Sequence, residues 1–281
     1  MDNVEKPSKT KLQKMAPVGK VVDRGGNRLI PELFKLGPIT VFPWGLSLSI
    51  AILLGTFIGI KLAGAIGIDA DRVLDLAIVL VVGGVVGARL FYVFIYEPAY
   101  YFREPLQILA LWNGGMVYYG ALIGGFITGT LYVVRKRLPF WKFSDVVAPP
   151  LALGYGIVRI GCFLNGCCYG TPTQSFLGVI FRYSGGTACP DPVPRYPTQI
   201  FSSLLGFLLF GLLMYLSKKK RFDGQVFLTF LILYSIGRII VEYFRENLIV
   251  FGNITVSQLV SVLIIIPAVV FYLVRGREAK N

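Results

Sequence analysis

Histidine is absent from this chain of 281 residues. That absence removes the usual general base, the usual proton relay and the commonest metal ligand at once. Charged residues are also scarce, because they make up 15% of the chain against about 25% of a typical soluble domain. The few cysteines all fall within one short region, at Cys162, Cys167, Cys168 and Cys189. The composition therefore excludes an ordinary soluble enzyme that works through histidine.

Apolar residues take the place of the missing charges, since 55% of the chain is hydrophobic. They recur in runs of roughly 18–23 residues, the length that a helix needs to cross a bilayer. The sequence predicts an all-α integral membrane protein with about seven transmembrane helices, in a single domain over residues 39–276. The expected spans cover residues 42–62, 74–94, 116–134, 146–163, 199–216, 226–241 and 256–274.

Polar segments flank and interrupt these spans. Residues 1–38 form a basic tail without the apolar core of a cleavable signal peptide, so we expect the first span to direct insertion. Residues 97–112 are rich in aromatics and contain two prolines, which predicts an arm at the membrane interface. Residues 164–196 form a loop rich in glycine, proline and cysteine, and loops of this length are commonly functional. A short tail, residues 277–281, ends the chain.

The net charge of +13 is distributed unevenly among the loops. Outside the basic tail, the loops after the first, third and fifth spans and the end of the chain hold Lys61, Arg72, Arg135, Lys136, Arg137, Lys142, Lys218, Lys219, Lys220, Arg221, Arg275, Arg277 and Lys280. The opposite loops hold only Arg103, Arg182, Arg195 and Arg245. Basic loops face the cytoplasm, so the arm 97–112 and the loop 164–196 are expected on the extracytoplasmic side. Membrane topology and lipid headgroups account for the charge, and we expect no nucleic-acid partner.

The segment from Arg159 to Gly170 reads RIGCFLNGCCYG and ends an apolar run with an arginine. A charge at that depth costs about 2.5–3.5 kcal/mol on insertion scales and marks a functional site by default. Arg89, in the second span, is a charge of the same kind. Glycine-rich backbone at this depth lines protein or a watery cavity. We expect Gly114, Gly115 and Gly170 to let backbone N–H groups approach a ligand, although helix packing explains each glycine alone equally well.

The sixth span ends GRIIVEYFREN and places Arg238, Glu242, Arg245 and Glu246 on one helical stripe. Charges in a lipid-embedded helix face the bundle interior or a cavity. Arg159 and Arg238 together fit a shared phosphodiester, because guanidinium groups bind phosphate through paired donors. The alternative is a structural ladder of ion pairs that holds this span to its neighbours.

The cysteines admit four interpretations. A disulfide from Cys167 or Cys168 to Cys189 is favoured, because disulfides form on the extracytoplasmic side. A metal site is disfavoured, since the adjacent Cys167 and Cys168 lack the usual spacing of about two to four residues between ligands. We accordingly expect neither a metal nor a cofactor. A catalytic cysteine has no obvious base nearby, and unpaired buried thiols are the last alternative.

Together these segments resemble the prolipoprotein diacylglyceryl transferase family. Asp145, before the fourth span, belongs to the same series of matching positions. The segments occur in the order that the family has and cover most of the chain. They are GARL at residues 87–90, WNGGMVYYGALIG at 112–124, RIGCFLNGCCYGTPT at 159–173, YPTQ at 196–199 and GRIIVEYFRE at 237–246.

The resemblance implies a seven-span enzyme of the bacterial inner membrane, whose catalytic domain would be residues 39–276. Its substrates would be phosphatidylglycerol and prolipoprotein signal peptides with a lipobox cysteine. The enzyme would transfer the diacylglyceryl group to that cysteine and release glycerol phosphate. Arg159 and Arg238 would hold the phosphate, and Glu242 would orient Arg238. The residues expected to bind substrate are Gly114, Gly115, Asp145, Asn165, Gly170, Arg89 and Arg245.

Two positions where this family usually has histidine carry Tyr119 and Tyr196 in this chain. Tyr119 is the first candidate for a base that acts on the substrate thiol, and anchoring at the interface is its alternative. Two other functions stay open: a relative that acts on another acceptor, and a transporter or lipid-binding protein with the same phosphate site. The absence of a convincing internal repeat weighs against a transporter.

Overall fold

The computed structural model describes residues 33–36, 39–111, 114–181, 193–245, 249–251 and 254–279. Helices dominate these ranges. They are α1 (Pro43–Gly64), α2 (Ala70–Ile95), α3 (Pro98–Arg103), the 3₁₀ helix η1 (Pro105–Leu109), α4 (Tyr118–Arg135), α5 (Phe140–Leu164), α6 (Thr198–Ser217), α7 (Gln225–Glu242) and α8 (Val256–Glu278). Three short antiparallel pairs join β1 (Phe34–Leu36) to β2 (Ile39–Val41), β3 (Val179–Ile180) to β4 (Pro194–Arg195), and β5 (Ile249–Phe251) to β6 (Ile254–Thr255).

Six of the described helices are long and apolar enough to cross a membrane: α1, α2, α5, α6, α7 and α8. They coincide with six of the seven expected spans and confirm an all-α integral membrane protein. The remaining expected span, residues 116–134, forms α4, whose 18 residues include glycines and tyrosines that lower its hydropathy. That α4 crosses the bilayer stays a prediction. The arm 97–112 contains α3 and η1, which are too short to span.

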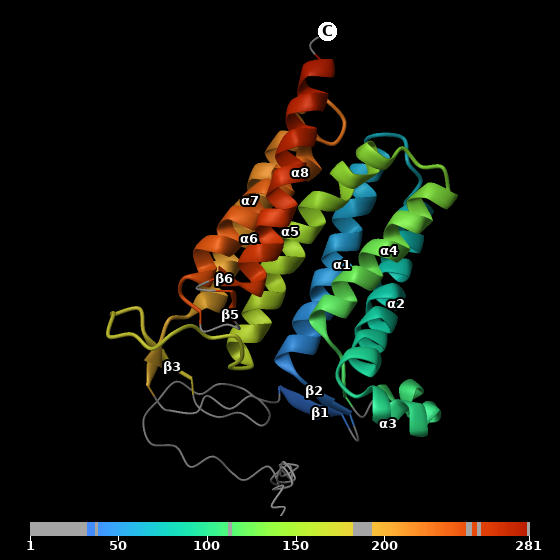
Figure 1. Ribbon diagram of the computed structural model, residues 1–281. Helices are drawn as coiled ribbons and strands as arrows, with labels where there is room; N and C mark the ends of the chain where they lie inside the picture. The colour runs from blue at the N-terminus through green and yellow to red at the C-terminus, as the bar shows by residue number, and fades with distance from the viewer. Residues whose placement is uncertain are drawn as a thin grey trace, which may run out of the picture.

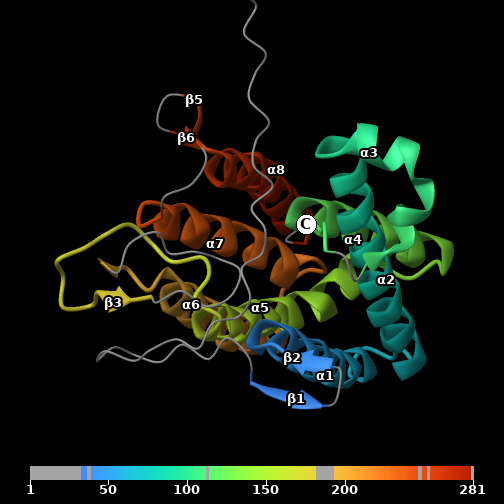
Figure 2. The ribbon, with the colours of Figure 1, turned by 90° about the horizontal axis from the view of Figure 1, so that it is seen from below.

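The helices stand side by side, and their connections separate into two groups at opposite ends of the bundle (Figure 1). The short strand pairs and α3 lie at one end, the lower end of Figure 1, which Figure 2 shows from below. The turns that follow α1, α4 and α6 lie at the other end, with the C-terminal end of α8. The loops that carry most of the basic loop residues therefore lie at the same end of the bundle. The membrane side that each end faces stays a prediction.

Glycines bring α2 and α4 into close contact. A Cβ added at Gly87 would lie 2.7 Å from the Cα of Gly124, and one added at Gly124 would lie 2.8 Å from the Cα of Gly87. A Cβ at Gly83 would meet the side chain of Thr128 on α4. Small residues permit this approach of two helix backbones.

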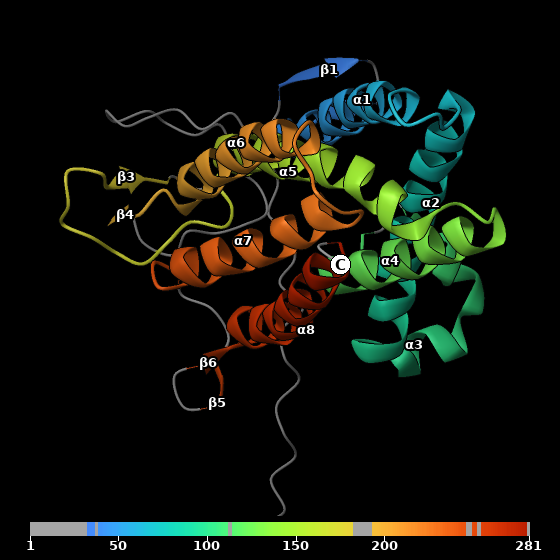
Figure 3. The same cartoon turned by 90° about the horizontal axis from the view of Figure 1, so that it is seen from above.

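Helix α5 occupies the middle of the bundle, between α1 and α6 and also against α7 (Figure 3). Gly156 of α5 and Gly206 of α6 touch, because a Cβ at Gly206 would lie 2.7 Å from the Cα of Gly156. Ser203 of α6 donates its hydroxyl to the carbonyl of Gly156 at 2.9 Å. This contact fixes the half of α5 that carries Arg159 beside the neighbouring helices.

Candidate functional site

The C-terminal end of α7 carries an arginine and a glutamate that bind each other and the start of α8. Arg238 Nη2 lies 3.1 Å from Glu242 Oε2 and donates to the hydroxyl of Ser257 at 3.0 Å. Thr255 donates to the other carboxylate oxygen of Glu242 at 2.9 Å. Glu242 is only 2% exposed. The carboxylate therefore holds the guanidinium in one orientation, while Nη1 of Arg238 is buried without a hydrogen-bond partner among the described residues.

Arg159 lies on α5 and is held by aromatic rings. Its guanidinium carbon is 5.1 Å from the ring centre of Tyr155, one turn earlier on the same helix. Tyr155 packs edge-on against Tyr234 of α7, with ring centres 5.0 Å apart, and Tyr234 is one turn before Arg238. The hydroxyl of Tyr155 is buried without a hydrogen-bond partner among the described residues. The Tyr155–Arg159 pair of α5 thus faces the part of α7 that carries Tyr234 and Arg238.

Arg245 follows α7. Together with Arg159 and Arg238 it forms the arginine group. Burial, and next the charges of Arg238 and Arg159, lower the pKa of Arg245, while Cys168 and Glu242 act in the opposite direction. Arg245 is therefore close enough to Arg238 and to Arg159 to be repelled by both. The Nε atom of Arg245 is buried without a hydrogen-bond partner in the described part of the chain. Buried charge of one sign needs compensation, and Glu242 supplies only part of it, so this group attracts an anion.

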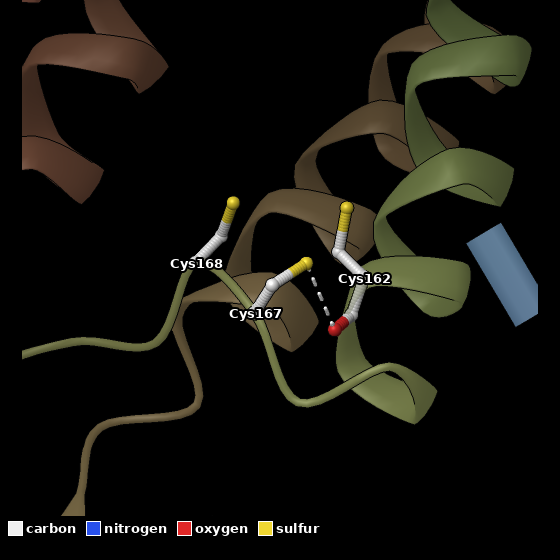
Figure 4. A group of neighbouring side chains, drawn as sticks. All are labelled: Cys162, Cys167 and Cys168. Atoms are coloured by element: carbon white, nitrogen blue, oxygen red, sulfur yellow. Dashed lines mark hydrogen bonds between the residues drawn. The ribbon is translucent and has the colours of Figure 1, made fainter. Parts of the chain in front are cut away.

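Three cysteines line the adjoining end of α5. Cys162, Cys167 and Cys168 are free thiols, and Figure 4 shows them next to one another. The neighbouring thiols of Cys162 and Cys167, and then the charges of Arg159 and Arg245, hold the pKa of Cys168 below its usual range, against the effect of burial. The expected disulfide partner, Cys189, lies outside the described residues, so that bridge stays a prediction.

The loop after α5 is tied to the ends of α6 and α7. Asn165 caps α5, with its N–H bound to the carbonyl of Gly161 at 2.9 Å. The N–H of Gly170 donates to the carbonyl of Tyr196 at 2.9 Å, and a Cβ at Gly170 would collide with the carbonyl of Phe244. Only glycine fits at position 170, because the loop packs closely against the end of α7. Asn165 and Gly170 lie in the loop that borders the arginine group, and their role in substrate binding stays a prediction.

Arg89 binds the backbone of its own chain, and a role in substrate binding stays a prediction. It is 3% exposed, and all three of its guanidinium nitrogens bind backbone carbonyls. The partners are Ile108 at 2.9 Å, Gln107 at 2.6 Å, Ala110 at 3.1 Å, Gly115 at 3.2 Å and Gly114. Gly114 and Gly115 therefore offer carbonyl oxygens to Arg89, and both have positive φ angles, +78° and +74°. These three residues position the segment between α3 and α4.

We expect Arg89→Lys to loosen this segment, because an ammonium group cannot reach so many carbonyls. Each buried carbonyl left without a donor costs about 1–3 kcal/mol, so the free energy of unfolding should fall by at least roughly 2 kcal/mol. Hydrogen exchange of residues 105–115 and thermal unfolding in detergent measure the effect. Arg103→Lys is the matched control, since Arg103 is an exposed arginine on the same arm. An unchanged exchange pattern together with a raised substrate KM would instead return Arg89 to substrate binding.

Asp145 lies far from the arginine group, although the resemblance places it in the site. It lies in the second turn of α5, fourteen residues before Arg159, which corresponds to about 20 Å along a helix. Its carboxylate accepts hydrogen bonds from the N–H groups of Gly224 at 2.9 Å and Phe227 at 3.0 Å and pairs with Lys220 at 3.0 Å. Asp145 therefore caps the start of α7 at the opposite end of the bundle.

Tyr119 and Tyr118 begin α4, with ring centres 5.9 Å apart. Tyr119 is half-buried. Tyr118, rather than Tyr119, interacts electrostatically with Tyr234, the residue beside Arg238. The sequence reasoning gave no role to Tyr155 and Tyr234. Their spacing could have indicated them, because a tyrosine stands four residues before Arg159 and before Arg238, in YGIVR and YSIGR.

The model of the family described as prolipoprotein diacylglyceryl transferase matches residues 31–274 of this chain. The chain belongs to that family. It is similar to the phosphatidylglycerol–prolipoprotein diacylglyceryl transferase of Clostridium tetani, with 37% identity over 252 residues, 88% of this chain and 99% of the relative. The corresponding proteins of Bacillus mycoides and Symbiobacterium thermophilum are each 34% identical, over 89% and 85% of this chain and 95% and 90% of their own lengths. The resemblance predicted from the sequence is confirmed.

Proposed function

We propose that this protein transfers the diacylglyceryl group of phosphatidylglycerol to the lipobox cysteine of a prolipoprotein. The thiolate sulfur of the substrate attacks the diacylglyceryl carbon that bears the phosphate. A carbon–sulfur bond forms, the carbon–oxygen bond breaks with its electron pair on the phosphate, and glycerol phosphate leaves. The thiol proton goes to the leaving phosphate or to solvent. Membership of the family and the names of the relatives support this reaction.

The proposal rests on one observation: the arginine group contains buried N–H donors that have no hydrogen-bond acceptor among the described residues. Arg238 Nη1 and Arg245 Nε have no hydrogen-bond partner among the described residues, and Arg159 adds a third positive charge next to them. A phosphate supplies the oxygen acceptors that these donors lack. Because negative charge grows on the phosphate as the carbon–oxygen bond breaks, guanidinium groups already in place stabilise the transition state.

Acid–base chemistry by the protein has only a modest share in this reaction. A cysteine thiol has an ordinary pKa of about 8.5, so a few per cent of the substrate is thiolate at neutral pH. Positioning of the thiolate against the lipid, with neutralisation of the phosphate, supplies the remaining catalysis. Glu242 acts through Arg238, which it holds in place. In this proposal the site opens on the extracytoplasmic side of the bacterial inner membrane, which exported prolipoproteins reach.

A direct transfer assay tests the function. The protein in lipid nanodiscs receives phosphatidylglycerol labelled in the glycerol carbons of its diacylglyceryl part and a peptide with a lipobox cysteine. The proposal expects label on the peptide in a bond that resists base hydrolysis, and glycerol phosphate in equal amount. A peptide with serine in place of the cysteine is the control. Labelled lipid that binds without transfer would instead support a lipid-binding or transport protein.

The phenol that assists the reaction can be assigned by matched variants. We expect Tyr118→Phe to lower kcat by about tenfold or more, a modest share of what a positioned proton-transfer group contributes, because Tyr118 interacts with Tyr234 beside Arg238. Tyr119→Phe should change kcat less, although the histidines of the family point to Tyr119 as the base. The measurement is the transfer rate at saturating lipid. The opposite ranking would make Tyr119 the assisting group.

A further inference from the structure

Three thiols converge where α5 passes into the loop that follows it. The Sγ atoms of Cys162, Cys167 and Cys168 all lie within 4.8 Å of one another, and Figure 4 shows the sulfur atoms gathered on one side of the loop. A metal ion with thiolate ligands at about 2.3 Å holds its sulfur atoms roughly 4 Å apart. Small rotations of these side chains would therefore be enough to bring the three sulfur atoms onto one ion.

The backbone explains how two adjacent cysteines serve one site. Side chains of consecutive residues in an extended chain point to opposite sides. Cys168 instead has a φ of +64°, and Gly166 has a φ of +71°, so the loop turns back toward α5. A left-handed conformation is uncommon outside glycine. It is this turn that places both loop thiols beside Cys162, despite the lack of the usual spacing between ligands.

Hydrogen bonds hold the loop in this shape. The hydroxyl of Thr198 donates to the carbonyl of Cys168 at 2.9 Å, and Nε2 of Gln199 donates to the carbonyl of Cys167 at 2.8 Å. Thr198 and Gln199 are each 1% exposed. The N–H of Cys167 also donates to the carbonyl of Cys162 at 3.1 Å. Supporting hydrogen bonds of this kind keep metal ligands in position.

We propose that Cys162, Cys167 and Cys168 form a three-thiolate site for a thiophilic metal ion of the zinc type. On binding, the three thiols release their protons to solvent, and a divalent ion with three thiolates carries one net negative charge. Arg159 and Arg245, which interact electrostatically with Cys168, compensate that charge. Thiolate ligands select soft ions over magnesium or calcium. The bound ion would tie the end of α5 to the loop beside the arginine group.

Metal analysis of the full chain tests the site. The protein is purified with a histidine-free tag, incubated with zinc, freed of excess ion on a desalting column and measured by mass spectrometry of the metal. The chain itself has no histidine, so imidazole binding does not interfere. About one zinc ion per chain is expected. Cadmium in place of zinc should give the ultraviolet charge-transfer absorption of cadmium–thiolate bonds, which reports thiolate ligation in the unaltered protein.

Single variants locate the ligands. Cys162→Ser, Cys167→Ser and Cys168→Ser should each lose most of the bound zinc and of the cadmium absorption, whereas Cys189→Ser keeps both. Thermal unfolding without metal shows that each variant is folded. Zinc binding that survives all three substitutions, or falls equally in Cys189→Ser, overturns the assignment. An unaltered protein without cadmium–thiolate absorption overturns it as well, as does a disulfide that involves any of the three cysteines, a bridge to Cys189 included, in mass spectra of the purified chain.

Discussion

Arg238→Ala should lower the transfer rate by at least about 10²–10³-fold, the loss seen when one preorganised donor to a developing anion is removed. The physical reason lies in the pair with Glu242, at 3.1 Å. This pair holds the guanidinium with Nη1 buried and unpartnered among the described residues. Without that donor, the departing phosphate loses its compensation in a region that water screens poorly. The measurement is kcat and KM in the nanodisc transfer assay.

Two controls separate this role from charge alone. Arg238→Lys keeps the positive charge but lacks the forked donors, so we expect a rate between those of the parent and Arg238→Ala. Arg135→Ala removes an exposed arginine at the far end of α4 and should leave the rate unchanged. A rate for Arg238→Ala within a factor of two of the parent would contradict the proposed phosphate site.

Gly124→Ala should destabilise the protein although alanine favours helices by about 1 kcal/mol over glycine. The new Cβ would lie 2.8 Å from the Cα of Gly87 and against the carbonyl of Gly83. These are backbone atoms of α2, which cannot rotate away, so the two helices must separate. Overpacking costs about 1–3 kcal/mol and occasionally more. Thermal unfolding in detergent should show a clear decrease in Tm and a loss of transfer activity.

Gly211→Ala is the matched control, because Gly211 also lies inside a long helix but has nothing within 4 Å of an added Cβ. Its Tm should stay the same or rise, since only the helix preference acts there. The two substitutions make the same chemical change and are expected to have opposite effects. Equal Tm values for the two variants would show that α2 and α4 do not depend on this close contact.

The apolar spans and the site arginines were predictable from the sequence. Hydropathy sums over neighbouring residues, so it locates a span without knowledge of what the span packs against. The cost of a charge in lipid is equally local, and it singled out Arg89, Arg159 and Arg238. The pattern of basic loops grouped the connections that the structure places at one end of the bundle.

Tertiary structure decided which polar residues share a site. Arg89 and Arg159 carry the same charge at similar depth, yet Arg89 is satisfied by carbonyls of its own chain, whereas Arg159 faces other cations. Asp145 caps α7 far from the arginines, and Tyr155 and Tyr234 meet only because α5 and α7 are neighbours. The sequence alone indicates that a buried charge needs a partner. Which residue becomes that partner depends on how the helices are rotated and packed against one another.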